Sequence, residues 1–462
     1  NRTFGRHDVN AMLLYNQDEL VNNVPGNNLI NSLPKRKQGL AGRLSYAYDG
    51  KYMAEVNMGY NGSENFAKGH RWGFFPSIAL GYNISEESFF EPLRKVITSM
   101  KLRGSWGLVG NDQIGGERFI YMPTINLSGK GFTTGIDQNY GLSGPVYTRY
   151  ENNSITWEVG EKINLGIDLQ LLNSLNIVVD IFRETRRDIF QKKGTIPTYL
   201  GTGNTDVFGN LAEMKNQGLD LSIDYNKAFS KDFYMNFKGT FTYAHNEITK
   251  YDEAPKYAFQ SKVGQSANVS QGYLSNGLFL DEAEIDRYNQ QMGSTLGAGD
   301  IKYLNVSNMH GYGDDIVDVD DWTWIGNPTV PEIVYGFGPS FKYKNWDFSF
   351  FFQGVAKTSL FMSGFHPFGD NSLRNVLQFV ANDRWSPTNQ NVDAKYPRLT
   401  RKTSLNNTNP GNSGRTSDYW MRDGSFLKLK NMELGYTFKR MRFYISGSNL
   451  LTFSKFDLWD PE

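Results

Sequence analysis

The sequence predicts an antiparallel transmembrane β-barrel, and three observations point to that fold class. Segments of about ten residues alternate apolar and polar side chains, which is the period of a strand and roughly the length that crosses a bilayer at a tilt. Aromatic residues make up 15% of the 462 residues, and 47 residues are glycine, a composition typical of barrel strands. Short turns and long connectors alternate between the predicted strands, as in outer-membrane barrels.

Thirteen strands are predicted along the chain. They are 9–15, 39–48, 51–60, 72–83, 100–109, 154–170, 174–190, 213–226, 232–247, 331–344, 346–357, 417–438 and 441–453. Short turns are expected at Asp49-Gly50, 171–174, Lys344-Asn345 and Lys439-Arg440. The long connectors, about 110–153, 191–212, 248–330 and 359–416, are expected outside the cell. Residues 91–97 indicate a short helix inside a turn, and 373–380 have helical spacing within a long loop.

Strand parity assigns each side chain to lipid or to the lumen, because a slip of one residue would move every charge into hydrocarbon. The apolar parity predicted to face lipid contains Tyr52, Val56, Met58, Ile163, Ile167, Phe233, Phe237 and Phe348. The polar parity predicted to face the lumen contains Glu55, Asn57, Asp168 and Lys238. Between 426 and 438 the apolar parity switches around Lys430-Asn431, which predicts a β-bulge near Asn431.

Composition excludes several other classes. No run approaches the roughly 18 apolar residues of a membrane helix, and the mean hydropathy is −0.51. The 48 Lys+Arg equal the 48 Asp+Glu, which leaves no general basic field for nucleic acid, and the absence of cysteine removes thiolate chemistry. The five histidines have no ligand or triad spacing, and strand parity makes Asp168 or Asp220 lumen-lining groups rather than acid/base pairs, so no enzyme is predicted. A soluble multi-sheet protein remains the alternative to a barrel.

Eleven short segments resemble, in order, the SusC/RagA family of TonB-dependent outer-membrane transporters. They are GLAGRLSY at 39–46, YNGSENF at 60–66, RWGFFPS at 71–77, KLRGSWG at 101–107, GND at 110–112, ITWE at 155–158, GDIKY at 299–303, IGNP at 325–328, SDYW at 417–420, LKLKN at 427–431 and SNLLTF at 448–453. Each segment is weak alone, but together they cover nearly the whole chain.

The resemblance implies a plug domain inside a 22-strand barrel, of which residues 1–462 form the C-terminal part with about thirteen strands and no plug. Thirteen strands leave open edges near 9–15 and 442–453, where other strands are expected. It also implies a Gram-negative outer-membrane importer of a large nutrient, most often an oligosaccharide. Its partners would be membrane lipid, a SusD-like surface lipoprotein, and TonB-ExbB-ExbD acting through the missing N-terminal part. An oligopeptide importer, and a structural or assembly component of a larger envelope complex, are the alternatives.

The acidic run 314–321 stands where family members often carry a calcium-like loop. Carboxylates at alternate positions beside a glycine suit Ca²⁺, and Asp314, Asp315, Asp318 and Asp320 are the candidate ligands. The spacing departs from the family loop, so a solvated acidic loop is the alternative. Trp322 and Trp324 are candidates for stacking on sugar rings or covering a partner, with an interfacial girdle or loop packing as the alternative. No other cofactor is expected.

Overall fold

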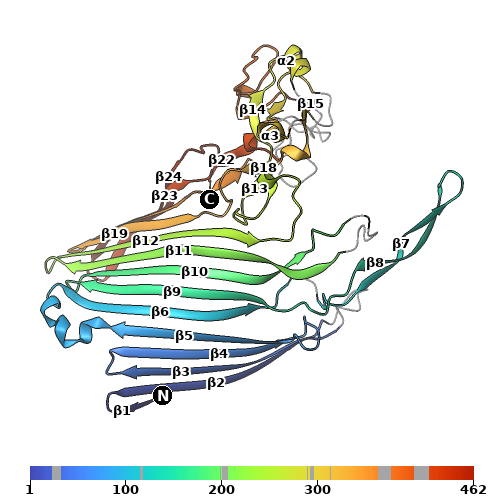
Figure 1. Cartoon of the computed structure of the whole chain (residues 1–462). Coiled ribbons are helices and arrows are strands. Elements are labelled where there is room, and N and C mark those ends of the chain that lie inside the picture. Colours follow the sequence, from blue (N-terminus) through green and yellow to red (C-terminus); the bar gives the residue numbers. More distant parts are fainter. Residues whose placement is uncertain are drawn as a thin grey trace. The chain divides into compact units, whose positions relative to one another are not determined.

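The computed structural model describes residues 1–22, 33–114, 118–197, 199, 206–288, 290–291, 296–312, 314–362, 376–399 and 416–461. The chain divides into two compact units, Asn1–Ala254 with Phe341–Tyr343, and Pro255–Ser340 with Lys344–Glu462. Antiparallel strands dominate (Figure 1), which confirms the predicted fold class. Among the described residues, no helix has both the length and the apolar character needed to cross a membrane.

The first unit is built on strands that pair antiparallel with their neighbours along the chain (Figure 1). They are β1 (Arg2–Phe4), β2 (His7–Leu20), β3 (Lys35–Tyr48), β4 (Tyr52–Ser63), β5 (Trp72–Asn83), β6 (Ile97–Asn111), β9 (Glu158–Leu171), β10 (Leu175–Lys192), β11 (Phe208–Ala228) and β12 (Phe233–Lys250). Nine of them correspond to predicted strands, and β1 was not predicted. The connector predicted at 110–153 contains a separate hairpin, β7 (Thr124–Thr134) with β8 (Tyr140–Arg149).

The short turns have the backbone that tight hairpins require. Asp49 and Gly50 have φ of 55° and 67°, and Leu172 and Asn173 have φ of 51° and 54°. We call the end of the first unit's sheet that carries these turns the short-turn end, and the opposite end the long-connector end.

The helix predicted at 91–97 is wrong in position. The helical turns are the 3₁₀ segments η1 (Ile84–Glu86) and η2 (Ser88–Leu93). They end before β6 because Ile97 already pairs with Leu171 in the sheet.

In the second unit, β20 (Trp346–Ala356), β23 (Phe426–Phe438) and β24 (Met441–Ser454) pair in that order, and β19 (Ile333–Tyr343) has residues in both units. The strand predicted at 417–438 is interrupted: η6 (Asp418–Trp420) and β22 (Met421–Asp423) precede β23. The predicted bulge is confirmed. Phe351 pairs with Asn431 and Phe352 with Leu429, so Lys430 is the extra residue.

The long connectors of the second unit fold into a compact body around a buried cluster, which we call the loop body. Its members are Tyr273, Leu278, Ile301, Tyr303, Val317, Met362, Val380, Trp385, Ala394, Tyr396, Trp420 and Phe456. Its elements are η4 (Ala258–Gln260), β13 (Ser270–Gly272), β14 (Ser275–Leu278), α2 (Glu282–Arg287), β15 (Gln290–Gln291), β16 (Ile301–Tyr303), α3 (Val306–Met309), β17 (Ile316–Val317), η5 (Val319–Asp321), β18 (Thr323–Ile325), β21 (Ser359–Phe361), α4 (Gln378–Asn382), η6 and β22. Of the helical pattern at 373–380, residues 373–375 lie outside the described residues.

Two strands have a ladder partner on one side only along most of their length, among the described residues. Strand β24 pairs with β23 alone, and β2 meets β1 only through residues 7–9 while it pairs with β3 throughout. The positions of the open edges therefore agree with the prediction.

Candidate functional site

The register of the first unit places the residues predicted to face the lumen on one face of its sheet. Residues directly opposite each other in an antiparallel ladder project to the same face. Glu55 pairs with Ala79, Ala79 with Ser105, and Ser105 with Asn164, which shares its parity with Asp168. The ladders continue through β10 and β11 to Lys238, which pairs with Asp224. We call this surface the polar face.

An ion network on the polar face joins three strands. The Arg103 guanidinium on β6 donates through Nε to Asp168 Oδ1 on β9 at 2.9 Å. Its two Nη atoms donate to the carboxylate oxygens of Asp180 on β10 at 2.8 and 2.7 Å. Gly166 stands opposite Arg103 in the ladder, and a Cβ there would lie 2.6 Å from Asp180 Oδ1. Glycine at this position therefore leaves room for a fixed, charge-compensated fork.

A second network covers the polar face of β3 to β5. Arg43 donates to Asn57 Oδ1 at 3.1 Å and lies 3.2 Å from Glu55 Oε1. Asn57 in turn donates to Ser77 Oγ at 3.3 Å. Each network pairs its arginine with carboxylate, two carboxylates in the case of Arg103, and still presents side chains that make hydrogen bonds. Such a surface can exchange hydrogen bonds with a polar solute.

The opposite face of the same sheet is apolar and exposed. Tyr52, Tyr82, Leu102 and Ile167 follow one another across four strands in a single row. Val56 is 49% exposed, and Met58 and Ile163 are also exposed. Phe233 and Phe237 share the parity of Tyr225 on this face. In the second unit, Phe348 lies in a row with Leu434 and Ile445.

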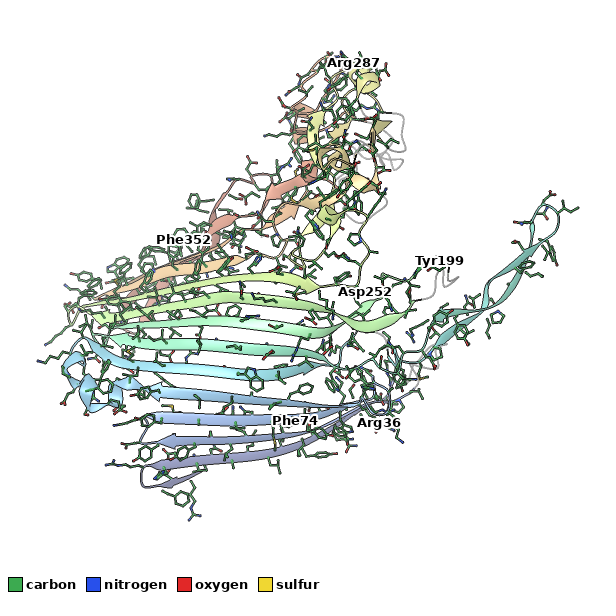
Figure 2. All side chains as sticks on the ribbon, in the orientation of Figure 1. Arg36, Phe74, Tyr199, Asp252, Arg287 and Phe352 are labelled. Atoms are coloured by element: carbon green, nitrogen blue, oxygen red, sulfur yellow. The ribbon has the colours of Figure 1, made fainter. Side chains whose placement is uncertain are left out.

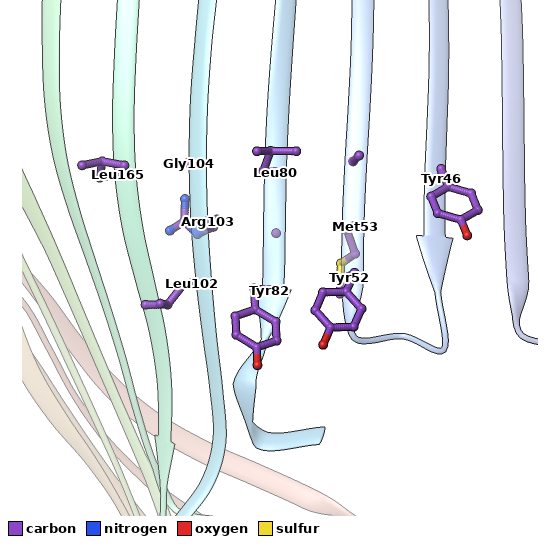
Figure 3. A pocket seen from close by; sticks show the side chains of 11 residues that line it. Tyr46, Tyr52, Met53, Leu80, Tyr82, Leu102, Arg103, Gly104 and Leu165 are labelled. Atoms are coloured by element: carbon purple, nitrogen blue, oxygen red, sulfur yellow. The ribbon is translucent and has the colours of Figure 1, made fainter. Parts of the chain in front are cut away.

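A shallow hollow on the apolar face lies near the short-turn end (Figure 3). Leu80, Leu102 and Leu165 line it, Gly104 lies between Leu80 and Leu165 in one ladder row, and Ala54 lies on the other side of Leu80. The rings of Tyr52 and Tyr82 stack at 5.2 Å between centroids. Both hydroxyls lie within hydrogen-bond distance of Glu87 Oε1, at 2.6 and 3.5 Å, and the hydrogen bond from Tyr52 holds the pKa of Glu87 below its usual range. Tyrosines whose rings lie against an apolar band and whose hydroxyls reach water are typical of the aromatic girdle at a membrane interface.

The acidic run of the loop body is occupied by local contacts. Asp318 caps η5 by accepting from the Asp320 N–H at 2.8 Å, while Asp320 forms an ion pair with Lys256. Asp314 accepts from the Ile316 N–H, and Asp315 is exposed. Within the described ranges, which omit Gly313, no group of three or more histidine or carboxylate side chains is arranged to hold a metal. Calcium binding at 314–321 stays a prediction.

The two candidate tryptophans pack within the loop body. Trp322 places its ring edge against Tyr273 at 6.0 Å between centroids. Trp324 donates from Nε1 to the Ser261 carbonyl at 2.8 Å. Both are half-buried, and a role in binding sugar or partner stays a prediction.

Sequence reasoning missed the pair that links two long connectors. Asp300 is buried and accepts from Arg398 Nε and Nη2 at 2.7 and 2.9 Å, although 98 residues separate them. The GDIKY segment was the only signal, and it does not point to Arg398. Nearby, burial raises the pKa of Tyr419, whose hydroxyl donates to the Ala394 carbonyl at 2.7 Å.

An antiparallel sheet with one polar face and one exposed apolar face is typical of the wall of a membrane β-barrel. The family described as "TonB dependent receptor-like, beta-barrel" matches residues 1–450, and the chain belongs to that family. It is an outer-membrane protein of a Gram-negative bacterium.

Known relatives agree with the resemblance seen in the sequence. The chain is 27% identical over 445 residues to TonB-dependent receptor P3 of Formosa agariphila, covering 91% of this chain and 41% of the relative. It is 28% identical over 447 residues to TonB-dependent receptor SusC of Bacteroides thetaiotaomicron, with the same two coverages. The fold is similar to a chain of the RagAB peptide transporter, with a TM-score of 0.69, 20% identity, and coverage of 99% and 51%. The chain thus spans less than half the length of these curated relatives.

Proposed function

We propose that the chain forms part of the wall of a TonB-dependent channel that imports a large polar nutrient across the outer membrane. The observation that carries the proposal is the two-sided sheet of the first unit. One face is fit for lipid, and the other bears fixed networks such as Arg103 with Asp168 and Asp180. Energy would be transmitted by TonB-ExbB-ExbD through the part of the protein that corresponds to the relatives' remaining length.

An oligosaccharide is the substrate class that the polar face favours. The charges of Arg103 and Arg43 are already compensated by three carboxylates, which leaves one excess negative charge, so the wall offers hydrogen bonds with only a weak net field. A neutral polyhydroxylated solute can exchange such hydrogen bonds with water at little cost in desolvation. A SusD-like lipoprotein on the long connectors would capture the solute from outside.

Disruption of the gene and growth on single nutrients test the proposal. We expect the disrupted strain to lose growth on one oligosaccharide class and to regain it when the whole gene is restored. Calorimetry on the purified complex should then show binding of that glycan and none of a mixed oligopeptide pool. Binding of peptides alone would establish the oligopeptide alternative. Unchanged growth on every nutrient, with a defect in envelope integrity, would contradict import and establish the structural role.

A further inference from the structure

We propose that a cationic hollow at the long-connector end of the first unit binds the phosphate-bearing head group of an outer-leaflet lipid. The hollow is lined by Gln17, Arg36, Lys37, Gln38, Gly62, Ser63, Glu64, Arg71 and Trp72. No part of the import proposal requires this site.

The register places the hollow at the end of the apolar face. Gln17, Gln38, Gly62 and Trp72 form one row across β2, β3, β4 and β5. Gly62 has the same parity as the lipid-facing Val56 and Met58 on β4. The row therefore continues the lipid-facing surface, but polar side chains replace apolar ones in β2 and β3.

The spacing of the aromatic residues places this row at the membrane surface. Trp72 and Tyr82 are ten residues apart on β5, which is about 33 Å along a strand. At a tilt of about 40° this length spans about 25 Å, the height of the apolar band of an outer-membrane barrel. Since Tyr82 belongs to the girdle at the short-turn end, Trp72 lies at the other interface.

Cationic groups dominate the rim of the hollow. Arg36 and Lys37 lie at the start of β3, and Arg71 directly precedes β5. Lys37 forms an ion pair with Asp112 at 2.7 Å, so Arg36 and Arg71 are the cations that the hollow offers to a ligand. The side chain of Arg36 is 64% exposed and forms an ion pair with Glu19, with 2.9 Å between Nη2 and Oε1. The Arg71 guanidinium donates through Nε to the Phe66 carbonyl at 3.1 Å, and within the described part of the chain it has no carboxylate partner. An exposed guanidinium fork matches phosphate oxygens in geometry and charge.

The aromatic wall of the hollow is held in place by a glycine. The Trp72 ring stacks on Tyr60 at 4.7 Å between centroids and 14° between planes. A Cβ at Gly62 would lie 3.1 Å from the Trp72 ring, so the indole rests directly on the backbone there. Amphipathic rings fixed in this way are suited to the boundary between head groups and acyl chains.

The surface next to the hollow favours a lipid over a soluble anion. Phe74 is 57% exposed, and Leu40 and Leu44 are also exposed on the same face. Figure 2 shows Arg36 and Phe74 toward the long-connector end of their strands. A ligand with a phosphate group and acyl chains would form ion pairs with the arginines of the hollow and would also cover these apolar side chains. Basic residues beside a membrane-spanning segment each strengthen anionic lipid binding about fivefold.

Lipid retention by the full-length transporter tests the site. The protein is purified from outer membranes, delipidated in detergent, and reconstituted in phosphatidylcholine nanodiscs containing lipid A bisphosphate. Native mass spectrometry then counts retained lipid A. We expect the double variant Arg36→Gln/Arg71→Gln to weaken retention about 25-fold, from fivefold for each cation. The matched control Lys231→Gln removes an exposed cation from the turn between β11 and β12 at the short-turn end, and it should retain lipid A normally. Heat-modifiable gel migration verifies that both variants fold.

Two further arms identify the source of the phosphate on the unaltered protein, so the result does not depend on the variants folding. Dephosphorylated lipid A should be retained at least tenfold less than the bisphosphate form, and millimolar inorganic phosphate should not displace the bound lipid. Equal retention of the two lipids would overturn the proposal. So would equal loss in the Lys231→Gln control, or displacement by inorganic phosphate, which would assign the hollow to a soluble anion.

Discussion

The sheet of the first unit exposes apolar side chains, whereas the loop body of the second unit buries them. In the sheet, Leu165 and Leu80 are 63% and 58% exposed, and the charged network of Arg103 occupies the other face. In the loop body, Ile301 and Tyr303 are fully buried within a packed cluster of apolar side chains. Exposed apolar side chains are stable in contact with lipid, and buried ones are stable in a domain that is surrounded by water. The exposed apolar face of the sheet is stable against lipid, whereas the loop body buries its apolar side chains as a protein does in water.

The largest expected effect tests the loop body as an independent hydrophobic core. Trp420 is 1% exposed and contacts the Tyr419 and Tyr396 rings. Trp420→Ala should destabilise the loop body by about 3–5 kcal/mol because it leaves a cavity in a packed core. Limited proteolysis in increasing urea measures the loss, while heat-modifiable migration of the sheet should not change.

The matched control is Trp346→Ala, since Trp346 is 50% exposed at the start of β20. It should leave the proteolysis of the loop body unchanged. Equal damage from the two variants would show that burial does not distinguish the two regions.

The second prediction tests whether the apolar face contacts the lipid bilayer. Leu165 lies near the middle of β9, so Leu165→Arg places a charge close to the bilayer midplane. We expect a loss of about 2–4 kcal/mol in lipid bilayers. The measurement is equilibrium unfolding of the full-length protein in vesicles.

Asn164→Arg on the neighbouring position is the control, because Asn164 belongs to the polar face and its charge would remain in water. It should cost much less than Leu165→Arg. The reverse order of the two variants would invert the assignment of faces.

The sequence predicted the sheet far better than the loop body, for a physical reason. Strand parity and turn residues such as Asp49-Gly50 are local signals, and the bulge at Lys430 appears as a switch of parity within one strand. The loop body depends on contacts such as Asp300 with Arg398, which no local pattern encodes. The β7–β8 hairpin was missed because its glycine-rich strands lack a continuous alternation.

The prediction of the candidate site was limited in the same way, because its residues come from distant parts of the chain. Lumen-facing Asp168 was predicted from parity, but its partner Arg103 lies 65 residues earlier and required the ladder register. The acidic run at 314–321 was predicted to bind calcium, which stays a prediction; its capping and ion-pair contacts, with the Asp320 N–H and with Lys256, are visible only in three dimensions.

The third prediction concerns backbone strain where the sheet is irregular. Asn449 lies beside the bulge with φ of +52°, a conformation that β-branched residues adopt only with strain. Asn449→Val should cost about 1–2 kcal/mol, and Asn449→Gly should be neutral or slightly stabilising. Unfolding midpoints of the two variants in one detergent provide the comparison. A Gly variant as damaged as the Val variant would mean that the side-chain contacts of Asn449, and not its φ, matter at this position.

The smallest expected effect concerns the polar end of the apolar face, where Glu87 accepts from the Tyr52 hydroxyl at 2.6 Å. This hydrogen bond holds the pKa of Glu87 below its ordinary value of 4.5, so the folded state favours the ionised carboxylate. The resulting stabilisation is fully present above pH 4.5 and is lost as the pH falls through the lower, folded pKa. Glu87→Gln should therefore change the unfolding midpoint only slightly at pH 7 and should remove part of the decline seen on acidification below 4.5. Glu86→Gln is the matched control, because Glu86 is exposed and lies 3.8 Å from Arg94, and it should keep that decline. If Glu87→Gln declined on acidification as steeply as the unaltered protein, the carboxylate of Glu87 would not be what holds the tyrosine girdle to the turn.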